Sequence, residues 1–163
     1  MTKAISIIDG DPGVLDSLSI LFASKGYEVA RHASAKSFLE AEYVSGCVIS
    51  DVRMPEMTGL DLLRELKSHM DPRPIVILTG HGDIEMAVQA VRLGAFEFFE
   101  KPFKHDKLIE TVERAEKELE ELSELRARVE SLTQRQKETL RHLIDGLATK
   151  DIAQKLGLSP RTV

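Results

Sequence analysis

The sequence predicts an α/β fold: a doubly wound sheet of five parallel strands with helices on both faces, followed by all-α segments. Apolar strand-like runs fall near residues 4–9, 27–31, 47–51, 75–79 and 96–100. Segments with apolar residues at helical spacing lie between them. Such alternation implies right-handed crossovers and a parallel sheet. In addition, Asp9, Asp51 and Thr79 end the first, third and fourth runs and Lys101 directly follows the fifth, at the strand ends where open α/β sheets place their chemistry.

The segments between the runs carry helix signals. Asp11-Pro12 is typical of an N-cap with proline at the first helical position, and Gly94 is typical of a helix end. Apolar residues at helical spacing predict a helix after the first, third and fourth runs: Leu15, Leu18, Ile20, Leu21 and Phe22; Leu60, Leu62, Leu63 and Leu66; Met86, Val88, Ala90, Val91 and Leu93.

Composition limits the class of protein. The chain has 163 residues, 42% of them hydrophobic, which is enough for a substantial core. Its single cysteine, Cys47, excludes an internal disulfide and favours a reducing cytoplasm, with Cys47 as a core residue. No apolar run approaches the roughly 18 residues of a membrane span, so no membrane partner is expected. The net charge is −5, yet residues 133–163 hold six Lys and Arg against three Asp and Glu, which is compatible with nucleic acid.

The polar residues at the strand ends predict a phosphoryl site. Asp51 closes the run at 47–51, Asp9 closes the first run, Thr79 the fourth, and Lys101 follows the fifth. Because parallel strands present their carboxyl ends at one edge, these side chains should meet there. A carboxylate can attack phosphorus while a divalent cation offsets the charge, and a hydroxyl and an ammonium can hold the phosphoryl oxygens. Asp51 is the candidate nucleophile.

Three motifs carry a resemblance to a known family. They are Asp51 with Met54-Pro55-x-Met57-x-Gly59, then Thr79-Gly80-His81-Gly82, then Lys101-Pro102-Phe103. Residues 1–120 resemble the flavodoxin-like receiver domain of bacterial response regulators. The resemblance implies that Asp51 is the phosphoacceptor, Thr79 and Phe98 form the switch, and Lys101 binds the phosphoryl group. It also implies a sensor histidine kinase as phosphoryl donor and a cis Lys101–Pro102 bond.

The metal site is where the sequence departs from that family. The resemblance implies Mg²⁺ held by Asp9, Asp51 and the backbone carbonyl of Arg53. Receiver domains usually end the first strand with two adjacent acids, and Gly10 stands where the second belongs. Asp11 could substitute only if the loop shifts, and we expect it to cap a helix instead. Weak Mg²⁺ binding and slow phosphorylation are therefore predicted.

Residues 104–132 predict one long helix that extends from the receiver into a coiled-coil linker. The stretch contains neither Gly nor Pro, and its apolar residues recur at steps of three and four with one stammer. The first turns should complete the receiver, and a twin helix in a homodimer is the expected partner of the seam. A solvated, charge-rich helix is the alternative. The predicted dimer seam is Leu108, Val112, Ala115, Leu119, Leu122, Leu125, Val129 and Leu132.

Residues 133–163 predict part of a helix-turn-helix module. A helix ends at Gly146, a shorter one spans 149–156, and Ser159-Pro160 begins a third. The stretch is similar to the LuxR/FixJ type of DNA-binding domain. We expect it to be C-terminally truncated where the recognition helix begins, so that the full-length protein binds DNA specifically and this chain does not. The candidate DNA contacts are Lys150, Ser159, Arg161 and Thr162.

The predicted function is a cytoplasmic two-component transcription regulator, phosphorylated on Asp51, and not an enzyme. Gly10 leaves open an alternative, a receiver that acts by dimerisation without phosphorylation. A haloacid-dehalogenase-type phosphatase would share the Asp9-x-Asp11 pattern, but Gly13 stands where Thr or Val belongs, and neither a late acidic pair nor a cap insertion is visible. An aspartyl-phosphate on Asp9 would support the phosphatase. Phosphorylation assays with and without Mg²⁺ distinguish the phosphorylated regulator from the receiver that acts by dimerisation alone.

Overall fold

A five-stranded parallel sheet forms the first part of the molecule. The computed structural model describes residues 3–80 and 84–156. Its strands lie in the order β2-β1-β3-β4-β5, so the order reverses between β1 and β3. This confirms the predicted parallel sheet, and each strand agrees with its predicted run to within one residue at either end. The strands are β1 Lys3–Ile8, β2 Tyr27–His32, β3 Cys47–Asp51, β4 Ile75–Thr79 and β5 Glu97–Glu100.

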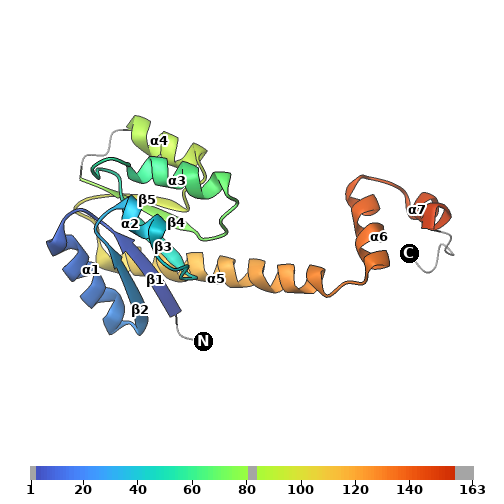
Figure 1. Cartoon of the computed structure of the whole chain (residues 1–163), viewed down its shortest axis with the longest axis horizontal. Coiled ribbons are helices and arrows are strands. Elements are labelled where there is room, and N and C mark those ends of the chain that lie inside the picture. The colour runs from blue at the N-terminus through green and yellow to red at the C-terminus, as the bar shows by residue number, and fades with distance from the viewer. Residues whose placement is uncertain (1–2, 81–83, 157–163) are drawn as a thin grey trace. The chain divides into compact units, whose positions relative to one another are not determined.

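Helices cover both faces of the sheet (Figure 1). One face carries α1 and α5, and the other carries α2, α3 and α4. The bounds are α1 Pro12–Ser24, α2 Ala35–Glu40, α3 Gly59–Ser68, α4 Ile84–Arg92 and α5 His105–Glu130. Because successive strand side chains point to opposite faces, Ile5 and Ile7 join the core under α1 and α5, while Ile8 joins the core on the other side.

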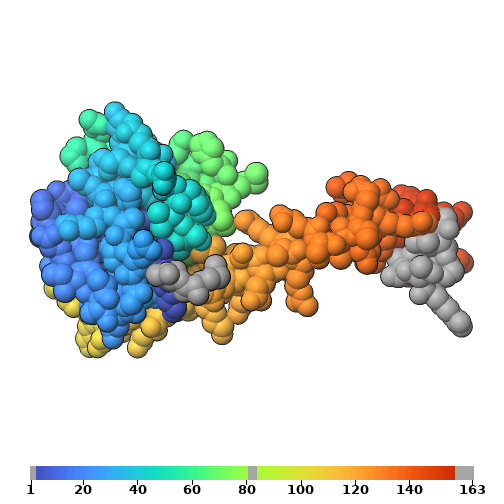
Figure 2. All heavy atoms as spheres, turned by 60° about the horizontal axis from the view of Figure 1, so that its bottom comes forward, coloured from blue at the N-terminus to red at the C-terminus, as the bar shows by residue number. Residues whose placement is uncertain are grey.

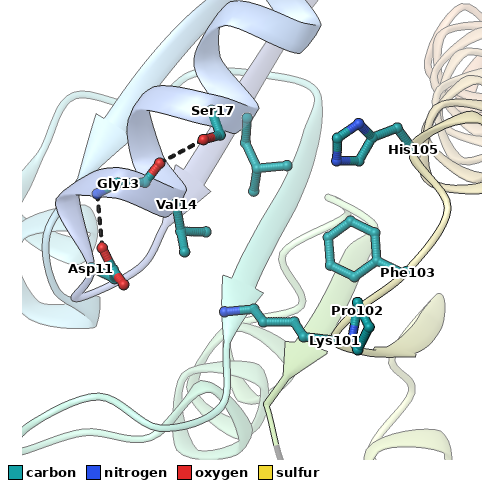
Figure 3. A pocket seen from close by; sticks show the side chains of 9 residues that line it. Asp11, Gly13, Val14, Ser17, Lys101, Pro102, Phe103 and His105 are labelled. Atoms are coloured by element: carbon teal, nitrogen blue, oxygen red, sulfur yellow. Dashed lines mark hydrogen bonds between the residues drawn. The ribbon is translucent and has the colours of Figure 1, made fainter.

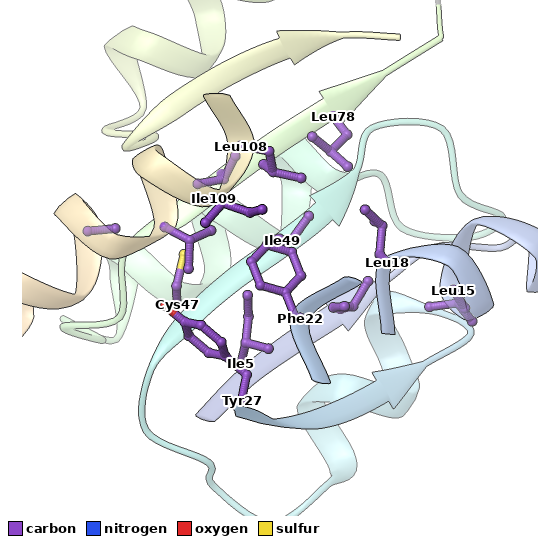
Figure 4. Close-up of a cluster of buried hydrophobic side chains, with 14 residues drawn as sticks. Ile5, Leu15, Leu18, Phe22, Tyr27, Cys47, Ile49, Leu78, Leu108 and Ile109 are labelled. Carbon is purple, nitrogen blue, oxygen red and sulfur yellow. The ribbon is translucent and has the colours of Figure 1, made fainter. Parts of the chain in front are cut away.

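The core between the sheet and helices α1 and α5 is shown in Figure 4. Phe22 from α1 packs edge-on against Tyr27 of β2, with ring centroids 5.4 Å apart. Cys47 is fully buried in this core, and burial raises the pKa of its thiol, so the prediction of a core residue is confirmed. β3 and β4 are buried along their whole length, as expected for central strands covered on both faces.

Local capping determines where several helices begin. The Asp11 side chain accepts a hydrogen bond from the Gly13 backbone N–H at 2.8 Å and caps α1, as predicted. Ser34 and Thr58 form reciprocal capping boxes at α2 and α3. The Asp11 carboxylate is therefore held at the start of α1.

Helix α5 corrects the predicted dimer seam. It ends at Glu130, so Leu132 lies outside the helix. Leu108, Val112 and Ala115 are fully buried in the core of their own receiver, because this face of α5 covers the sheet. These three residues are therefore not available to a partner helix. The outer seam, defined here as Leu122, Leu125 and Val129, is exposed to 48%, 56% and 38%.

The chain divides into two compact units, residues 1–120 and 121–163. In the second unit, α6 spans Gln134–Ile144 and α7 spans Thr149–Leu156, the latter with its predicted bounds. Thr133 caps α6, and Gly146 follows it with a φ of 79°, a left-handed conformation that glycine adopts without strain. Ile152 and Ala153 of α7 are buried, and the Arg135 guanidinium donates to the Leu156 carbonyl at 2.7 Å. Among the described residues, none of the helices has the length and apolarity to cross a membrane.

Candidate functional site

The candidate site lies at the carboxyl edge of the sheet, where the strand order reverses. Asp9 directly follows β1, Asp51 is the last residue of β3, Thr79 is the last of β4, and Lys101 directly follows β5. β1 and β3 are neighbours on either side of this reversal, which is where open α/β sheets bind ligands. The topology thus gathers residues that are far apart in the sequence.

The Lys101 ammonium bridges the two carboxylates. Its Nζ donates to Asp51 Oδ1 at 2.8 Å and to Asp9 Oδ2 at 3.0 Å. The second oxygen of each carboxylate accepts a backbone N–H at 2.8 Å, from Asp11 for Asp9 and from Arg53 for Asp51. Both carboxylates are almost fully buried, with side-chain exposures of 6% and 9%. Charge pairing and hydrogen bonds offset the cost of burying them.

The electrostatics of the cluster favour a charged lysine. Burial by itself lowers the pKa of the Lys101 ammonium, but the hydrogen bonds and charges of Asp51 and Asp9 outweigh it. The net effect is a pKa raised above the ordinary lysine value. The cluster holds two acids and one lysine, and this excess of one acidic group favours a bound cation.

Thr79 is the last residue of β4, and Phe98 lies within β5. Thr79 is fully buried, and its backbone carbonyl accepts a hydrogen bond from the Lys101 N–H at 2.7 Å. Phe98 is partly buried and packs against the core on the α3 and α4 side of the sheet. The Lys101–Pro102 bond is cis, which confirms that prediction. His81 lies outside the described residues.

The loop after Asp51 brings α3 against the end of β3. The Gly59 N–H donates to the Val52 carbonyl at 3.0 Å. A Cβ at position 59 would lie only 2.2 Å from the Asp51 carbonyl oxygen, so this position requires glycine. In the loop between β3 and α3, Glu56 adopts a left-handed backbone conformation with a φ of 66°. This conformation costs free energy for a residue with a side chain.

The donor set fits a cation held largely through water. Among residues 3–80 and 84–156 there is no group of three or more His, Cys, Asp and Glu side chains that could hold a metal. The site offers the Asp9 and Asp51 carboxylates, which meet at Lys101. Mg²⁺ commonly keeps several waters and binds through one or two carboxylates. These residues fit Mg²⁺, but with fewer charged ligands than a three-acid site.

A hollow of about 450 Å³ borders the cluster on the α1 side (Figure 3). Figure 3 shows Lys101 reaching toward the start of α1, with Phe103 and His105 on the facing segment. Val14, Leu18, Pro102 and Phe103 supply apolar walls, and the polar lining consists of Asp11, Ser17, Lys101 and His105. The charged cluster thus lies next to a surface that can bury apolar groups.

The structure also reveals polar residues that sequence reasoning missed. Arg73 is buried, pairs with Asp71 at 2.7 Å, and stacks on the rings of Phe38 and Tyr43. Glu116 on α5 is buried against Tyr27. A signal for Glu116 was present, because it lies four residues after Val112 and seven after Ile109 on the apolar stripe of the helix.

Comparison with known proteins agrees with this geometry. Residues 5–113 match the response regulator receiver domain family, and residues 130–163 match the luxR family of bacterial regulatory proteins. The chain is 42% identical to the transcriptional regulatory protein FixJ of Bradyrhizobium diazoefficiens, over 98% of this chain and 82% of that protein. This chain is a response regulator of the FixJ/NarL type. The response regulator protein TodT of Pseudomonas putida is 41% identical, over 99% of this chain and 75% of that protein.

Solved structures show the same fold. Full-length FixJ from B. japonicum matches with a TM-score of 0.70 and 41% identity, over 99% of this response regulator and 84% of that chain. The response regulator StyR matches with a TM-score of 0.72 and 36% identity, over 99% and 86% of the two chains. A receiver joined to a LuxR-type helix-turn-helix identifies a phosphorylation-dependent regulator of transcription rather than a member of an enzyme family.

The predicted DNA contacts are only partly described in this response regulator. Lys150 lies on α7 and is exposed. Ser159, Arg161 and Thr162 lie outside the described residues. Their role in DNA binding remains a prediction, and so do the domain boundaries at residues 120 and 133.

Proposed function

We propose that Asp51 is the phosphoacceptor of this response regulator. The observation that carries the proposal is the Lys101 bridge, because Nζ lies 2.8 Å from Asp51 Oδ1 and can neutralise an oxygen of a phosphoryl group bound there. An Asp51 carboxylate oxygen attacks phosphorus on the phosphohistidine of a sensor kinase. The phosphorus–nitrogen bond breaks, and its electron pair leaves with the imidazole. We assign the Thr79 hydroxyl, at the end of the neighbouring strand β4, to another phosphoryl oxygen.

We assign the metal ligands to Asp9, Asp51 and the backbone carbonyl of Arg53. A bound Mg²⁺ would offset the negative charge of the carboxylates and the phosphoryl group. Asp9 holds Lys101 at 3.0 Å, so it also positions the ammonium beside Asp51. Because Gly10 contributes no carboxylate, this site should bind Mg²⁺ weakly.

The output we infer is dimerisation of a cytoplasmic regulator on DNA. Helix α4 presents an exposed apolar stripe at helical spacing, with Ile84 86%, Val88 42% and Val91 66% exposed. An uncovered stripe of this kind is typical of an interaction surface, and we assign it to receiver pairing after phosphorylation, with Thr79 and Phe98 as the switch. The helix-turn-helix then binds DNA.

The test is phosphorylation by acetyl phosphate with and without Mg²⁺, read by mass spectrometry. The wild-type chain should gain one phosphoryl group on Asp51, and Asp51→Asn should gain none. Asp61→Asn is the matched control, because Asp61 is an exposed acid in the capping box of α3. Equal labelling of wild type and Asp51→Asn would overturn the assignment, and label trapped on Asp9 would support the phosphatase alternative.

A further inference from the structure

The last turns of α5 carry an apolar face that the described chain leaves uncovered. The outer seam of Leu122, Leu125 and Val129 follows steps of three and four along one side of the helix. The shallow groove on this side is lined by these three residues with Arg126 and Glu130. Figure 2 shows the side chains of this part of α5, coloured orange, at the molecular surface. Three exposed apolar side chains in register require an occupant if they are to leave water.

The residue types identify the occupant as a second copy of the same helix. In heptad terms Leu122 and Val129 fall at a and Leu125 at d. Val129 is the β-branched a residue that, together with Leu at d, is typical of two parallel strands. Glu121 then falls at g and Arg126 at e. In a parallel, in-register pair the g residue of one helix faces the e residue five positions later on the other. Glu121 therefore meets Arg126 of the second copy, twice by symmetry.

The outer seam is too short to hold two copies together without a second contact. Leu122 to Val129 covers eight residues, roughly 12 Å at 1.5 Å per residue. Stable coiled coils need about three or four heptads, and this seam supplies little more than one. Leu108, Val112 and Ala115 cannot lengthen it, because they are buried in the receiver core, and Leu119 between them and the outer seam is half-buried. Two copies should pair here only when another contact already raises their effective concentration.

We propose that the outer seam is a parallel, in-register self-association surface that closes only after the receivers have paired. The proposal rests on the phosphorylation-dependent pairing proposed above and specifies where and how the second copy binds. The outer seam then forms a contact only when a first contact is already made. Receiver pairing brings the two copies together, and Leu122, Leu125 and Val129 then pack against their counterparts, just before the helix-turn-helix in the sequence.

Site-directed disulfide cross-linking of the 163-residue chain tests the orientation. A parallel, in-register pair places the two copies of residue 125 face to face, within the Cα separation that a disulfide needs. Leu125→Cys should therefore form a covalent dimer under mild oxidation. Ala127→Cys is the matched control, because Ala127 is exposed on the opposite side of the same helix. Cys47 is buried and present in both variants. Cross-linking that is equally fast in the two variants would overturn the proposal.

Acetyl phosphate tests whether pairing of the outer seam depends on pairing of the receivers. It should speed Leu125→Cys cross-linking by at least about tenfold, the gain expected from raised effective concentration, and leave Ala127→Cys slow. If Asp51 is phosphorylated in the same sample and cross-linking does not change, the seam does not depend on receiver pairing, and this inference is wrong while the proposed function stands. If Asp51 is not phosphorylated, the proposed function fails, and cross-linking at raised protein concentration still tests the seam.

A charge exchange tests the register. In the Leu125→Cys background, Glu121→Arg and Arg126→Glu should each slow cross-linking, because each creates like charges across the pair. The double substitution should restore the rate. Circular dichroism of each variant verifies that helix content is kept. A double variant no faster than either single one would show that the helices do not pair parallel and in register.

Discussion

The Tyr27 hydroxyl on β2 donates a 2.9 Å hydrogen bond to Glu116 Oε2 on α5. Lys3 Nζ of β1 lies 3.5 Å from the same oxygen and 5.6 Å from the centre of the Tyr27 ring. This group anchors α5 to two strands about four residues before the first unit ends. Burial raises the pKa of Glu116, an effect that Tyr27 and Lys3 offset only in part, and burial with the Glu116 contact raises the pKa of Tyr27.

Tyr27→Phe should destabilise the receiver. The ring is kept, but the buried Glu116 carboxylate loses its hydroxyl donor, a loss of about 1–3 kcal/mol in the free energy of unfolding. Urea denaturation at pH 7 measures it. Tyr43→Phe is the control, because Tyr43 is 60% exposed and its ring stacking on Arg73 survives, so a change within about 0.5 kcal/mol is expected. Equal effects of the two substitutions would show that the Tyr27 hydrogen bond to Glu116 does not stabilise the receiver.

Glu116→Gln should change how stability depends on pH. The folded receiver holds the Glu116 proton more tightly than the unfolded chain, because the pKa of Glu116 is raised above 4.5. The stability associated with that proton is present below pH 4.5 and is lost as the pH rises through the folded pKa. The difference in unfolding free energy between Glu116→Gln and wild type should therefore rise across this interval. A difference that is flat with pH would contradict the raised pKa.

Gly10→Asp should strengthen Mg²⁺ binding. A Cβ at this position would meet Pro55 Cδ at 4.0 Å, an ordinary contact, so a side chain can start here without a clash. A direct carboxylate ligand should raise Mg²⁺ affinity by more than the roughly 10–100-fold effect of outer-shell groups, and phosphorylation by acetyl phosphate should be faster. Calorimetry measures the affinity. Ser68→Asp adds the same charge at the end of α3 and should leave it unchanged. Unchanged affinity in Gly10→Asp would refute this description of the metal site.

Gly59→Ala should destabilise the receiver and slow phosphorylation of Asp51. The added methyl group would lie 2.2 Å from the Asp51 carbonyl oxygen and 3.0 Å from its carbonyl carbon, so α3 must move away from β3. Overpacking of this kind typically costs about 1–3 kcal/mol. Gly10→Ala is the control, since its methyl group meets only Pro55 Cδ at 4.0 Å. Urea denaturation and acetyl phosphate labelling compare the two variants. Equal free energies of unfolding would show that the loop accommodates the methyl group without destabilising the receiver.

The sequence alone determined the elements whose signals are local. β3, β4 and α7 have the predicted bounds, because continuous apolar runs and helix-end residues depend on near neighbours. The meeting of Asp9, Asp51 and Lys101 was also predictable. Parallel strands place their carboxyl ends at one edge, so a polar residue at each end is enough to locate the cluster.

Tertiary structure decided what each apolar stripe packs against. The steps of three and four along α5 are the same in Leu108, Val112 and Ala115 as in the outer seam, yet the first group covers its own sheet and the second is exposed. Periodicity reports that one side of a helix is apolar and says nothing of the partner. The pairing of Glu116 with Tyr27, 89 residues away, and the bridging of two carboxylates by one Lys101 ammonium likewise depend on distances that only the folded chain sets.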